Sequence, residues 1–466
     1  MNDTSAPTIV QQLSRYVSAL RYEDLPQDVV RQAKRLIVDT VGCALGGFHS
    51  EPARIARDIA ATVSSAQPAR LLVSGEATSP DLAAFANGVA IRYLDFNDGY
   101  TSTGESGHPS DSFAAVLAAG ELHRASGRDA ILATVIAYEV FCRVCDARDL
   151  KPLGFDHTTV GGLASAAAAA RLFRLEPARI EQALNLHVAA NVALYQTRIG
   201  NVSMWKGCAY ANASRNAVFA TMLAARGMSG PSPVYEGIGG YFKAVTRGAF
   251  SLPEMGGAQH PFRIMECSIK RFPLGQYSQT VAEAALQLRE RIADPARIES
   301  VHVATVSTAI RLMADDPDKW EPQTRESADH SMPYTVAIAL LHGEIGEEHF
   351  ADRFLFDPAV RALTRKVTVS ESDEANRRMP IAMLCEMTIR LRGGETLRAE
   401  VEYHRGHHRN PMSDAEVERK FRRLSQPVLA TPGCDRLLAR LWTLDEAADL
   451  GEVIRLTCPD ASRGAA

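Results

Sequence analysis

Three polar side chains share one unusual setting, directly ahead of a helical pattern whose first turns consist of small residues. His108 stands in GHPSDSFAAVLAAG, His157 in FDHTTVGGLASAAAAA, and Lys206 in MWKGCAYANASRNA. A helix N-terminus carries roughly half a positive charge and unpaired N–H groups, so it favours bound carboxylates and lowers the pKa of a nearby histidine. We therefore expect an acid–base site for carboxylic acids, although each residue taken alone could be an ordinary polar loop residue.

Candidate capping residues follow both histidines. Ser110 or Asp111 is the predicted N-cap after the first histidine, and Thr158 or Thr159 is the predicted N-cap after the second. These assignments place each imidazole at the start of a helix.

Two carboxylates precede the first histidine. Asp95 and Asp98 follow the apolar pattern ANGVAIRYL and are three residues apart, so on a continuing helix they would share a face. From that face they could orient a histidine or a lysine. Alternatively, Asp98 and the following Gly99 form the end of the helix and a turn.

A pair of cations stands near the middle of the chain. Lys270 and Arg271 end a short extended run in CSIKRFPLGQYSQTVAEAA, where Pro273 and Gly275 predict a turn into a helix. If this turn faces a cleft, both cations would pair with substrate carboxylates. Ordinary surface charge is the alternative.

A tyrosine and a histidine lie four residues apart at another predicted helix start. SADHSMPYTVAIALL contains His330 and Tyr334, with Asp329 and Ser331 as candidate caps. The Tyr334 hydroxyl could donate a proton in catalysis, or it could belong to a core residue whose hydroxyl is already satisfied. Spacing alone does not separate these two roles.

The sequence predicts no metal site and no nucleotide site. Cys142 and Cys145 form a CxxC inside a helical pattern, without a second pair or a histidine at ligand spacing, which indicates helix packing. His404, His407 and His408 lie in YHRGHHRNPMSD, which is predicted to be a surface loop. The glycine pairs lack the context of a nucleotide-binding loop.

Composition excludes several classes of partner. With 51 basic and 55 acidic side chains the net charge is −4, and no basic block of the kind that binds nucleic acid or anionic lipid is present. The N-terminus has no signal-peptide pattern, and no segment approaches the length of an apolar membrane span. We expect a cytoplasmic protein with reduced cysteines, without nucleic-acid or membrane partners.

The elements that must position these residues fall into two kinds. Residues 8–260 show almost continuous helical periodicity, whereas β-branched alternation begins near residue 265 and includes a hairpin turning at Gly393 and Gly394. Helical patterns return after residue 405. We predict a mainly α fold: a large all-helical domain over 1–265 and 406–466, with a smaller α+β domain inserted at 266–405. A cleft between the two domains suits a small ligand.

The longer blocks resemble the MmgE/PrpD family over almost the whole chain. They are VDTVGCALGG, ANGVAIRYLDFNDGY, GHPSD, FDHTTVGGLASAAAAARLF, MWKGCAYANASRNAVFATMLA, IKRFP, ADHSMPYTVAIALL and RGHHRNPMSDAEVERKF. That family includes 2-methylcitrate dehydratase, cis-aconitate decarboxylase and iminodisuccinate epimerase. The resemblance implies a large helical domain, a smaller α+β lid, a homodimer, and catalysis without a metal or an organic cofactor.

The resemblance also carries the family's active-site pattern onto this chain. The matching positions are Asp95, His108, His157, Lys206, Lys270 and Tyr334. Two departures stand out: Gly99 replaces a threonine, and Gly275 a histidine, that the decarboxylase relatives have. Both departures argue against decarboxylation of cis-aconitate.

The expected reaction is anti-elimination of water from a β-hydroxy polycarboxylate such as 2-methylcitrate. One of His108 and His157 would take the carbon-bound proton, and the other, or Tyr334, would protonate the leaving hydroxyl. Asp95 would fix a tautomer or position a cation. Which histidine is the base stays open.

Binding of the small polycarboxylic acid is assigned to Lys206, Lys270 and Arg271, together with the helix N-termini. An epimerase or isomerase of an amino-dicarboxylate such as iminodisuccinate would need the same acid and base, and a cis-aconitate decarboxylase is a further alternative. A carboxylate-binding protein without activity is the alternative outside enzymes. The two histidines and the tyrosine favour catalysis, because anion binding needs only cations and N–H groups.

Overall fold

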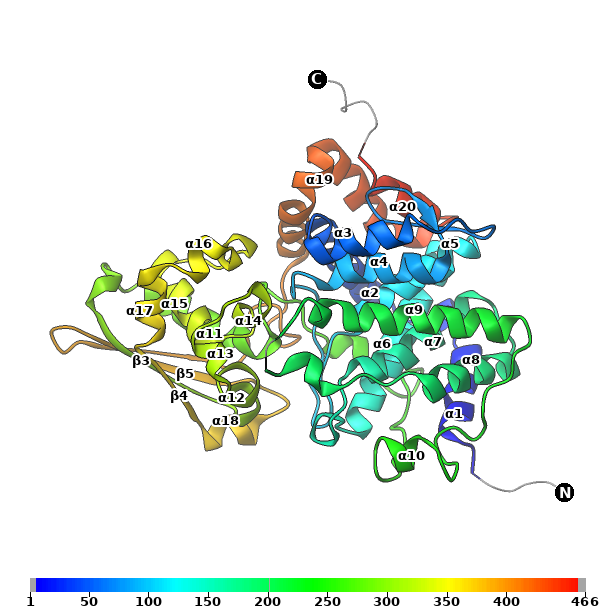
Figure 1. The fold of residues 1–466 in the computed structure, drawn as a ribbon, viewed down its shortest axis with the longest axis horizontal. Helices are drawn as coiled ribbons and strands as arrows, with labels where there is room; N and C mark the ends of the chain where they lie inside the picture. Colours follow the sequence, from blue (N-terminus) through cyan, green and yellow to red (C-terminus); the bar gives the residue numbers. More distant parts are fainter. Residues whose placement is uncertain (1–5, 201, 460–466) are drawn as a thin grey trace.

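The protein has a large helical body and a smaller lobe in which helices cover a sheet (Figure 1). The computed structural model describes residues 6–200 and 202–459. Helices dominate and strands are few and short, which confirms the predicted mainly α fold with a small α+β part.

The body is built from helices that pack on several sides. Its longer helices are α1 (Ile9–Ala19), α2 (Gln27–Gly47), α3 (Glu51–Ala60), α4 (Pro80–Arg92), α5 (Phe113–Leu122), α6 (Gly127–Ala147), α7 (Thr158–Leu172), α8 (Pro177–Ala190), α9 (Trp205–Ala225) and α19 (Asp414–Trp442). The short helices α10 (Tyr241–Ala244) and α20 (Gly451–Leu456) and the small strand pair β1 (Ala69–Arg70) and β2 (Ala77–Thr78) complete it.

Helix α7 lies at the centre of the body. Residues 158–170 are all buried, because the Gly and Ala residues of this segment let α6, α8 and α9 pack closely around it. Cys142 and Cys145 are fully buried in α6, which confirms that this CxxC serves helix packing. The small residues of α7 therefore allow its N-terminus to lie inside the protein.

The smaller lobe is a four-stranded sheet covered by short helices. Its strands are β3 (Ile298–Thr305), β4 (Val367–Glu371), β5 (Cys385–Leu391) and β6 (Thr396–Val401), in the order β4-β3-β5-β6. Only β3 and β4 are parallel. The β5–β6 hairpin turns at Gly393 and Gly394, whose φ angles of 102° and 91° are readily adopted by glycine, as predicted.

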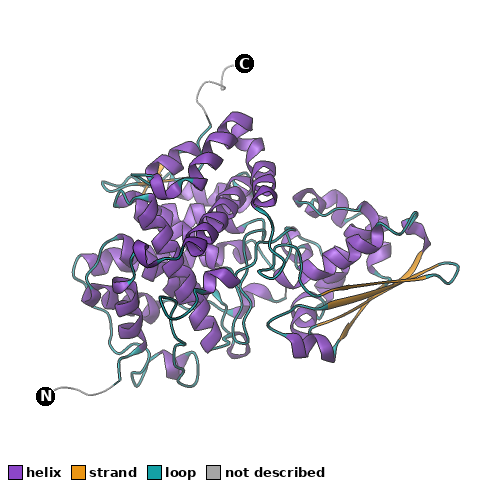
Figure 2. Cartoon of the chain, turned by 180° about the vertical axis from the view of Figure 1, so that it is seen from behind, coloured by secondary structure: helices purple, strands orange, loops and turns teal. Residues whose placement is uncertain are grey.

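Helices α11 (Gln279–Arg289) and α15 (Met332–His342) pack together on the sheet, and α17 (Pro358–Thr364) packs on α15. The remaining helices of the lobe are α12 (Ser307–Met313), α13 (Pro317–Trp320), α14 (Arg325–Ala328), α16 (Asp352–Leu355) and α18 (Asp373–Arg378). Figure 2 shows the strands at the outer end of the molecule, away from the helical body.

Each lobe has its own apolar core. The core of the body combines residues 9–269 with residues 412–454, because α19 packs back against α2. The core of the smaller lobe is drawn from residues 272–401. The chain thus leaves the body once, builds the smaller lobe and returns. Within the described part of the chain, no helix combines the length and the apolar character needed to cross a membrane.

Candidate active site

A small cavity lies where the two lobes meet, with a volume of about 70 Å³. The body contributes His108 and His157 to its wall, and the smaller lobe contributes Gly275, Gln276 and His330. The other lining residues are Arg92, Tyr100, Ser106, Gly107, Lys151, Tyr195, Arg198, Tyr277, Leu312 and Met313. We call this space the histidine cavity.

His108 is held in a single tautomer by the loop that precedes it. Its Nδ1 lies 2.6 Å from the backbone carbonyl oxygen of Asp98, and a carbonyl can only accept, so Nδ1 carries the hydrogen. Burial lowers the pKa of His108 well below its usual value, and the charges of Arg92 and Lys270 add to this shift. The Nε2 atom is therefore a free acceptor, without a hydrogen-bond partner among the residues that the structure describes.

His157 stands at the N-cap position of α7 beside a carboxylate. Its Nδ1 lies 3.5 Å from Asp156, whose carboxylate also accepts hydrogen bonds from Arg198 at 2.8 and 3.3 Å. Burial lowers the pKa of His157 to about 3, against the opposing charge of Asp156. Its Nε2 is buried and finds no partner within the described ranges. The two imidazole rings lie 5.5 Å apart, centroid to centroid.

The predicted N-caps were wrong, although both histidines do precede helices. His157 itself occupies the cap position of α7, and Asp156 accepts a hydrogen bond from the Thr158 N–H at 3.0 Å. His108 precedes a 3-10 turn (Pro109–Ser112) that leads into α5. Ser110 is drawn away from capping because its hydroxyl donates to the Asp98 carboxylate at 2.6 Å.

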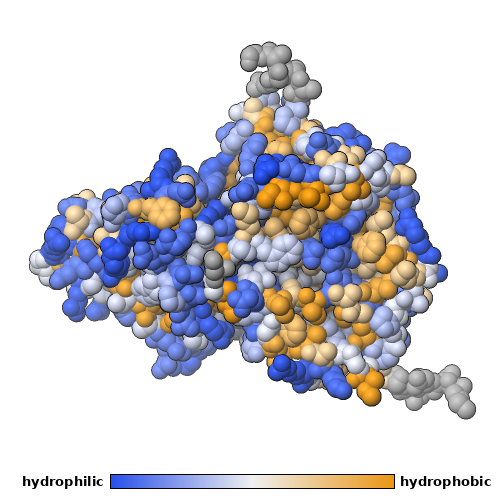
Figure 3. Space-filling model, viewed as in Figure 1, coloured by the Kyte–Doolittle hydropathy of each residue, from blue (hydrophilic) through white to orange (hydrophobic). Residues whose placement is uncertain are grey.

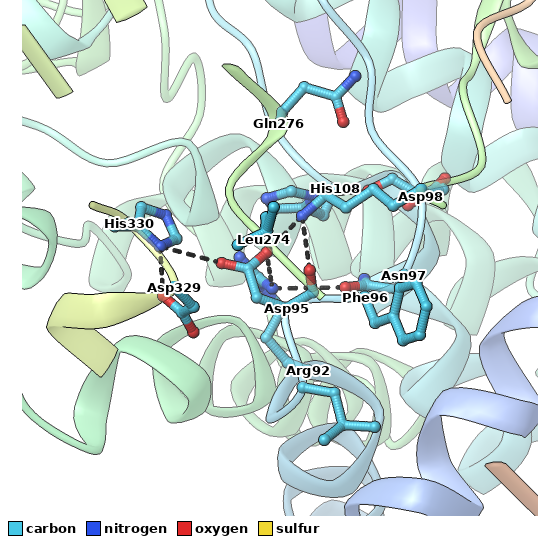
Figure 4. A network of polar contacts seen from close by, with 12 residues as sticks. Arg92, Asp95, Phe96, Asn97, Asp98, His108, Leu274, Gln276, Asp329 and His330 are labelled. Carbon is cyan, nitrogen blue, oxygen red and sulfur yellow. Dashed lines mark hydrogen bonds and ion pairs between the residues drawn. The ribbon is translucent and has the colours of Figure 1, made fainter. Parts of the chain in front are cut away.

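Beside the cavity, the Asp95 carboxylate interacts with two lysines. Its carboxylate pairs with Lys270, lies 3.4 Å from the Lys206 ammonium, and accepts a hydrogen bond from Arg92 at 2.7 Å. Lys206 also pairs with Asp329. Figure 4 shows Asp95 at the centre of this network, with Asp329 and His330 on one side and His108 on the other. Arg92, Asp95, Asp329 and the two lysines are almost completely buried, and neither lysine nor Asp95 lines the histidine cavity.

The continuing helix that would put Asp95 and Asp98 on one face is not formed. Helix α4 ends at Arg92, and Asp95 has a φ of 49°, which turns the chain out of helical geometry. The two residues nevertheless act on the predicted partners by other routes. Asp95 pairs with the lysines, and the carbonyl of Asp98 fixes His108.

Burial and the neighbouring charges shift the pKa values of this cluster in opposite directions. Burial lowers the pKa of Lys270 to about 8; the Asp95 carboxylate opposes this shift and the Arg92 guanidinium adds to it. Burial would raise the pKa of Asp95, but the positive charges of Arg92, Lys270 and Lys206 hold it well below its usual value. The cluster is therefore an ion network at neutral pH.

Three donor groups in this cluster lie close enough to hold a cation. Ligand atoms of Asp95, Asp329 and His330 lie within 4.8 Å of one another. However, the ammonium groups of Lys206 and Lys270 already bind these carboxylates and would repel a divalent cation. The lysines thus fill the electrostatic role that a metal would have here.

Lys420 anchors the two chain segments that carry this network. Its ammonium donates to the backbone carbonyls of Phe96 and Lys270 at 2.6 and 3.0 Å and lies 2.6 Å from the Asp39 carboxylate. The segments that carry Asp95 and Lys270 are thereby fixed to each other and to the body.

Sequence reasoning missed the cations that face the cavity. Arg92, Lys151 and Arg198 line it, and each is paired with a buried carboxylate of the body. Arg92 lies in ANGVAIRYL, and a charged residue at the end of an apolar helix could have been recognised as a candidate site residue. Lys151 and Arg198 lie in short 3-10 turns (Lys151–Leu153 and Tyr195–Arg198) without a sequence pattern, and only the folded chain brings them here.

His330 also lines the cavity, whereas sequence reasoning gave it no role. Its Nδ1 lies 2.6 Å from Asp329 and 2.9 Å from the Lys206 ammonium. Burial lowers the pKa of His330 to about 4, and the Lys206 charge adds to this shift. His330 therefore connects the ion network to the cavity wall.

Arg271 does not join the other predicted site residues. Its side chain is half exposed, lies 3.4 Å from Glu283 and lines a different space of about 540 Å³ at the lobe junction. That space, which we call the arginine cleft, also has Arg405, Lys420 and Arg423 in its wall. Successive residues alternate in direction here, so Lys270 points to Asp95 and Arg271 points away.

Tyr334 lies in the core of the smaller lobe rather than at the cavity. Its ring packs near Phe350, and its hydroxyl donates to the carbonyl oxygen of His349 at 2.6 Å. Of the two roles that the spacing left open, the geometry matches the core residue with a satisfied hydroxyl. Tyr334 is not placed to protonate a ligand in the histidine cavity.

The prediction of an exposed His-rich loop was wrong. His404 and His407 are buried, and His404 contacts Gln276 of the cavity wall with 3.4 Å between their side-chain nitrogens. The loop is polar in sequence, but Gln276 and Glu283 of the smaller lobe contact it, and they lie 128 and 122 residues away from their partners along the chain.

Larger side chains fill the space beside Gly99 and Gly275. A Cβ atom at Gly99 would lie 2.4 Å from Oε1 of Gln276, and one at Gly275 would lie 2.4 Å from Cε of Met313. Gln276 and Met313 therefore occupy the space that side chains at these positions would need.

Comparisons with known proteins agree with this architecture. Residues 11–252 match the MmgE/PrpD N-terminal domain, and residues 272–444 match the MmgE/PrpD C-terminal domain. Human cis-aconitate decarboxylase is 27% identical over 466 residues, covering 95% of this chain and 93% of that protein. The 2-methylcitrate dehydratase of Cupriavidus necator is 28% identical over 441 residues, covering 86% and 85%. The 2-methylcitrate dehydratase of Escherichia coli K12 is 28% identical over 422 residues, covering 84% of each chain.

Proposed function

This chain belongs to the MmgE/PrpD family, and we propose that it is a lyase that removes water from a β-hydroxy polycarboxylate such as 2-methylcitrate. Its relatives include both 2-methylcitrate dehydratases and cis-aconitate decarboxylases. Because their identities to this chain are nearly equal, the choice between the two reactions depends on the site.

One observation carries the proposal: two neutral histidines with free Nε2 atoms face the same small cavity as three cations. Arg92, Lys151 and Arg198 offer the positive charge that substrate carboxylates need, and their pairing with a carboxylate makes the adjacent C–H bond more acidic. His108 and His157 offer the proton acceptors. A binding protein would need the cations but not the paired imidazoles.

The histidine pair supplies both the base and the acid of an elimination. A bound polycarboxylate adds negative charge and raises the pKa of both rings, while repulsion over 5.5 Å disfavours charging them together. One ring then holds a proton for the leaving hydroxyl as the other takes the proton from carbon. We assign the base to His157, since Asp156 would stabilise the imidazolium that forms.

The glycines favour dehydration over decarboxylation. A decarboxylase must protonate the carbon from which carbon dioxide has left, so it needs an acid aimed at that carbon. Gly99 and Gly275 have no side chain to supply one, and Gln276 and Met313 fill the space beside them with groups that are not acids.

The test is direct. Purified protein given 2-methylcitrate or citrate should form an unsaturated acid that absorbs in the ultraviolet, whereas cis-aconitate should release little carbon dioxide. Chelator treatment should leave the rate unchanged, because lysines already neutralise Asp95 and Asp329. Rapid release of carbon dioxide from cis-aconitate would refute the dehydratase assignment, and racemisation of an amino-dicarboxylate would replace it with an epimerase.

We also propose a homodimer formed through the helical body. Figure 3 shows apolar surface gathered over the body, while the smaller lobe is mostly hydrophilic. Leu194, Trp205 and Phe219 are among the large apolar side chains exposed there, on α9 and the segment before it. Light scattering after gel filtration should give twice the chain mass, and Phe219→Asp should shift it towards the monomer.

A further inference from the structure

Gln276 contributes a buried amide to the histidine cavity. It begins a 3-10 turn (Gln276–Ser278) directly after Gly275, and the residue is only 9% exposed. A glutamine buried this far ordinarily has both ends of its amide hydrogen-bonded. The direction of the amide therefore decides what it offers to a ligand.

His404 fixes that direction. Its Nδ1 lies 3.1 Å from the carbonyl oxygen of Arg405, which can only accept, so Nδ1 carries the hydrogen. Burial lowers the pKa of His404 to about 4, so the ring is neutral and its Nε2 is an acceptor. The atom of Gln276 that lies 3.4 Å from this Nε2 must be the NH₂ group.

The opposite end of the amide is an acceptor without a donor. Oε1 of Gln276 is buried, and no donor contacts it in the part of the chain that the structure describes. Figure 4 shows this oxygen turned to the side on which His108 lies. Gly99 leaves room for it, because a Cβ atom there would lie 2.4 Å away. A buried carbonyl in this state is stabilised by any ligand that brings a donor.

We propose that Gln276 selects substrates that carry a hydroxyl group, by accepting a hydrogen bond from that hydroxyl through Oε1. The inference rests on the proposed function and deepens it. In an ionised β-hydroxy polycarboxylate the carboxylates only accept hydrogen bonds, so the hydroxyl is the only donor. An unsaturated acid such as cis-aconitate offers Oε1 no partner. His404 is the positioning residue that keeps the oxygen, and not the NH₂ group, turned towards the ligand.

The experiment compares matched acids that differ by one hydroxyl. Calorimetry measures the binding of citrate against propane-1,2,3-tricarboxylate, and of malate against succinate, to the wild-type protein and to Gln276→Met. Methionine keeps the length of the side chain and removes the acceptor. We expect the wild-type protein to prefer each hydroxy acid by at least about 10-fold, because a site built to bind a hydroxyl rejects the analogue that lacks it.

In Gln276→Met this preference should disappear, with the deoxy acids bound as before. Gly99→Ala gives a second route, since the added methyl group must displace Oε1, and His404→Phe should also lower the preference by freeing the amide to flip. A preference that survives in Gln276→Met, or in Gly99→Ala if the first variant does not fold, overturns the inference. So does a wild-type protein that binds both members of each pair equally.

Separate measurements of binding and of turnover distinguish a failure of this inference from a failure of the proposed function. A hydroxyl preference that depends on Gln276 in a protein that dehydrates none of these acids supports the inference and refutes the dehydratase. Dehydration of 2-methylcitrate at an unchanged rate by Gln276→Met refutes the inference and supports the dehydratase.

Discussion

The histidine cavity and the arginine cleft lie at the same junction, yet they differ in the state of their polar groups. The cleft is much the larger, at about 540 Å³ against about 70 Å³. Three arginines of the cleft are paired with carboxylates near the surface: Arg271 with Glu283, Arg405 with Glu416 and Arg423 with Glu347. The cations of the cavity are paired as well, but they are buried, and His157 and Gln276 keep buried acceptors without partners in the part of the chain that the structure describes.

This difference supports our choice of the histidine cavity as the candidate site, because unused hydrogen-bonding capacity is a more direct sign of ligand binding than size is. Paired surface charges contribute little to binding a ligand, because the ligand must first compete with the existing partner and with water. A buried acceptor without a partner has neither competitor. Five changes test the comparison, ordered from the largest expected effect to the smallest.

The free energy of unfolding should fall most when a buried ammonium beside the histidine cavity is removed. Lys206→Met leaves Asp95 and Asp329 short of a cation beside the histidine cavity, which should lower the free energy of unfolding by about 3–5 kcal/mol. On the arginine cleft, Arg423→Met removes a half-exposed pair and should lower it by less than about 1 kcal/mol. Urea unfolding measures both, and equal losses would contradict the contrast.

Removal of the assigned base should abolish most of the turnover. His157→Asn should lower kcat by roughly 100-fold or more, with the fold intact. The matched control is His187→Asn: His187 is equally buried in α8, burial lowers its pKa to about 4, and it does not line the cavity. Steady-state kinetics should leave this control near the wild-type rate. Similar losses in both variants would mean that burial, and not the site, explains the effect.

Activity should fall at alkaline pH. Because burial brings the pKa of Lys270 to about 8, this ammonium loses its charge above that pH and Asp95 loses one of its cationic partners. We expect kcat/KM to fall about 10-fold per pH unit above pH 8, the slope for loss of one essential proton. In Lys270→Arg the charge persists and the decline should vanish. The same decline in that variant would assign it to another group.

Tyr334→Phe tests whether this tyrosine belongs to the lobe core. The change removes one hydrogen bond, to the carbonyl of His349, and should lower the free energy of unfolding by about 1 kcal/mol. Thermal unfolding measures this loss, and kcat should stay at the wild-type value. A large fall in kcat would return Tyr334 to the role of a proton donor.

Arg271→Ala should have the smallest effect. The side chain is half exposed and its pair with Glu283 is long, at 3.4 Å. We expect kcat/KM to be unchanged for every substrate and stability to change by less than about 0.5 kcal/mol. A rise in KM for the polycarboxylate would show that the arginine cleft takes part in binding.

The residues that were found from the sequence are those whose signal is local. His108 and His157 stand before helices rich in Gly and Ala, and that local pattern reflects the close packing around α7 and α5. Lys206 was found in the same way, and Lys270 from a short extended run that ends in a turn. Asp95 was predicted as a possible partner of a lysine, but Asp329 was not, because it lies 123 residues from Lys206.

The missed features depend on contacts that are distant in sequence. Arg198 is held by Asp156, which lies 42 residues before it, and the buried His404 contacts Gln276, which lies 128 residues before it. Alternation along a short segment also escaped prediction, since Lys270 and Arg271 look alike in sequence but face opposite spaces. The fold class and the β5–β6 hairpin were predictable, because periodicity and paired glycines are local signals.

Gly99 and Gly275 have a consequence for how this chain can diverge from its relatives. A side chain at residue 99 would have to displace Gln276, and one at residue 275 would have to displace Met313. Both neighbours are the ends of flexible side chains, so they can move without being replaced. Among descendants of this chain, a larger residue at 99 should therefore turn the Gln276 amide away and one at 275 should shift Met313, so that a single mutation at either position would reshape the cavity wall.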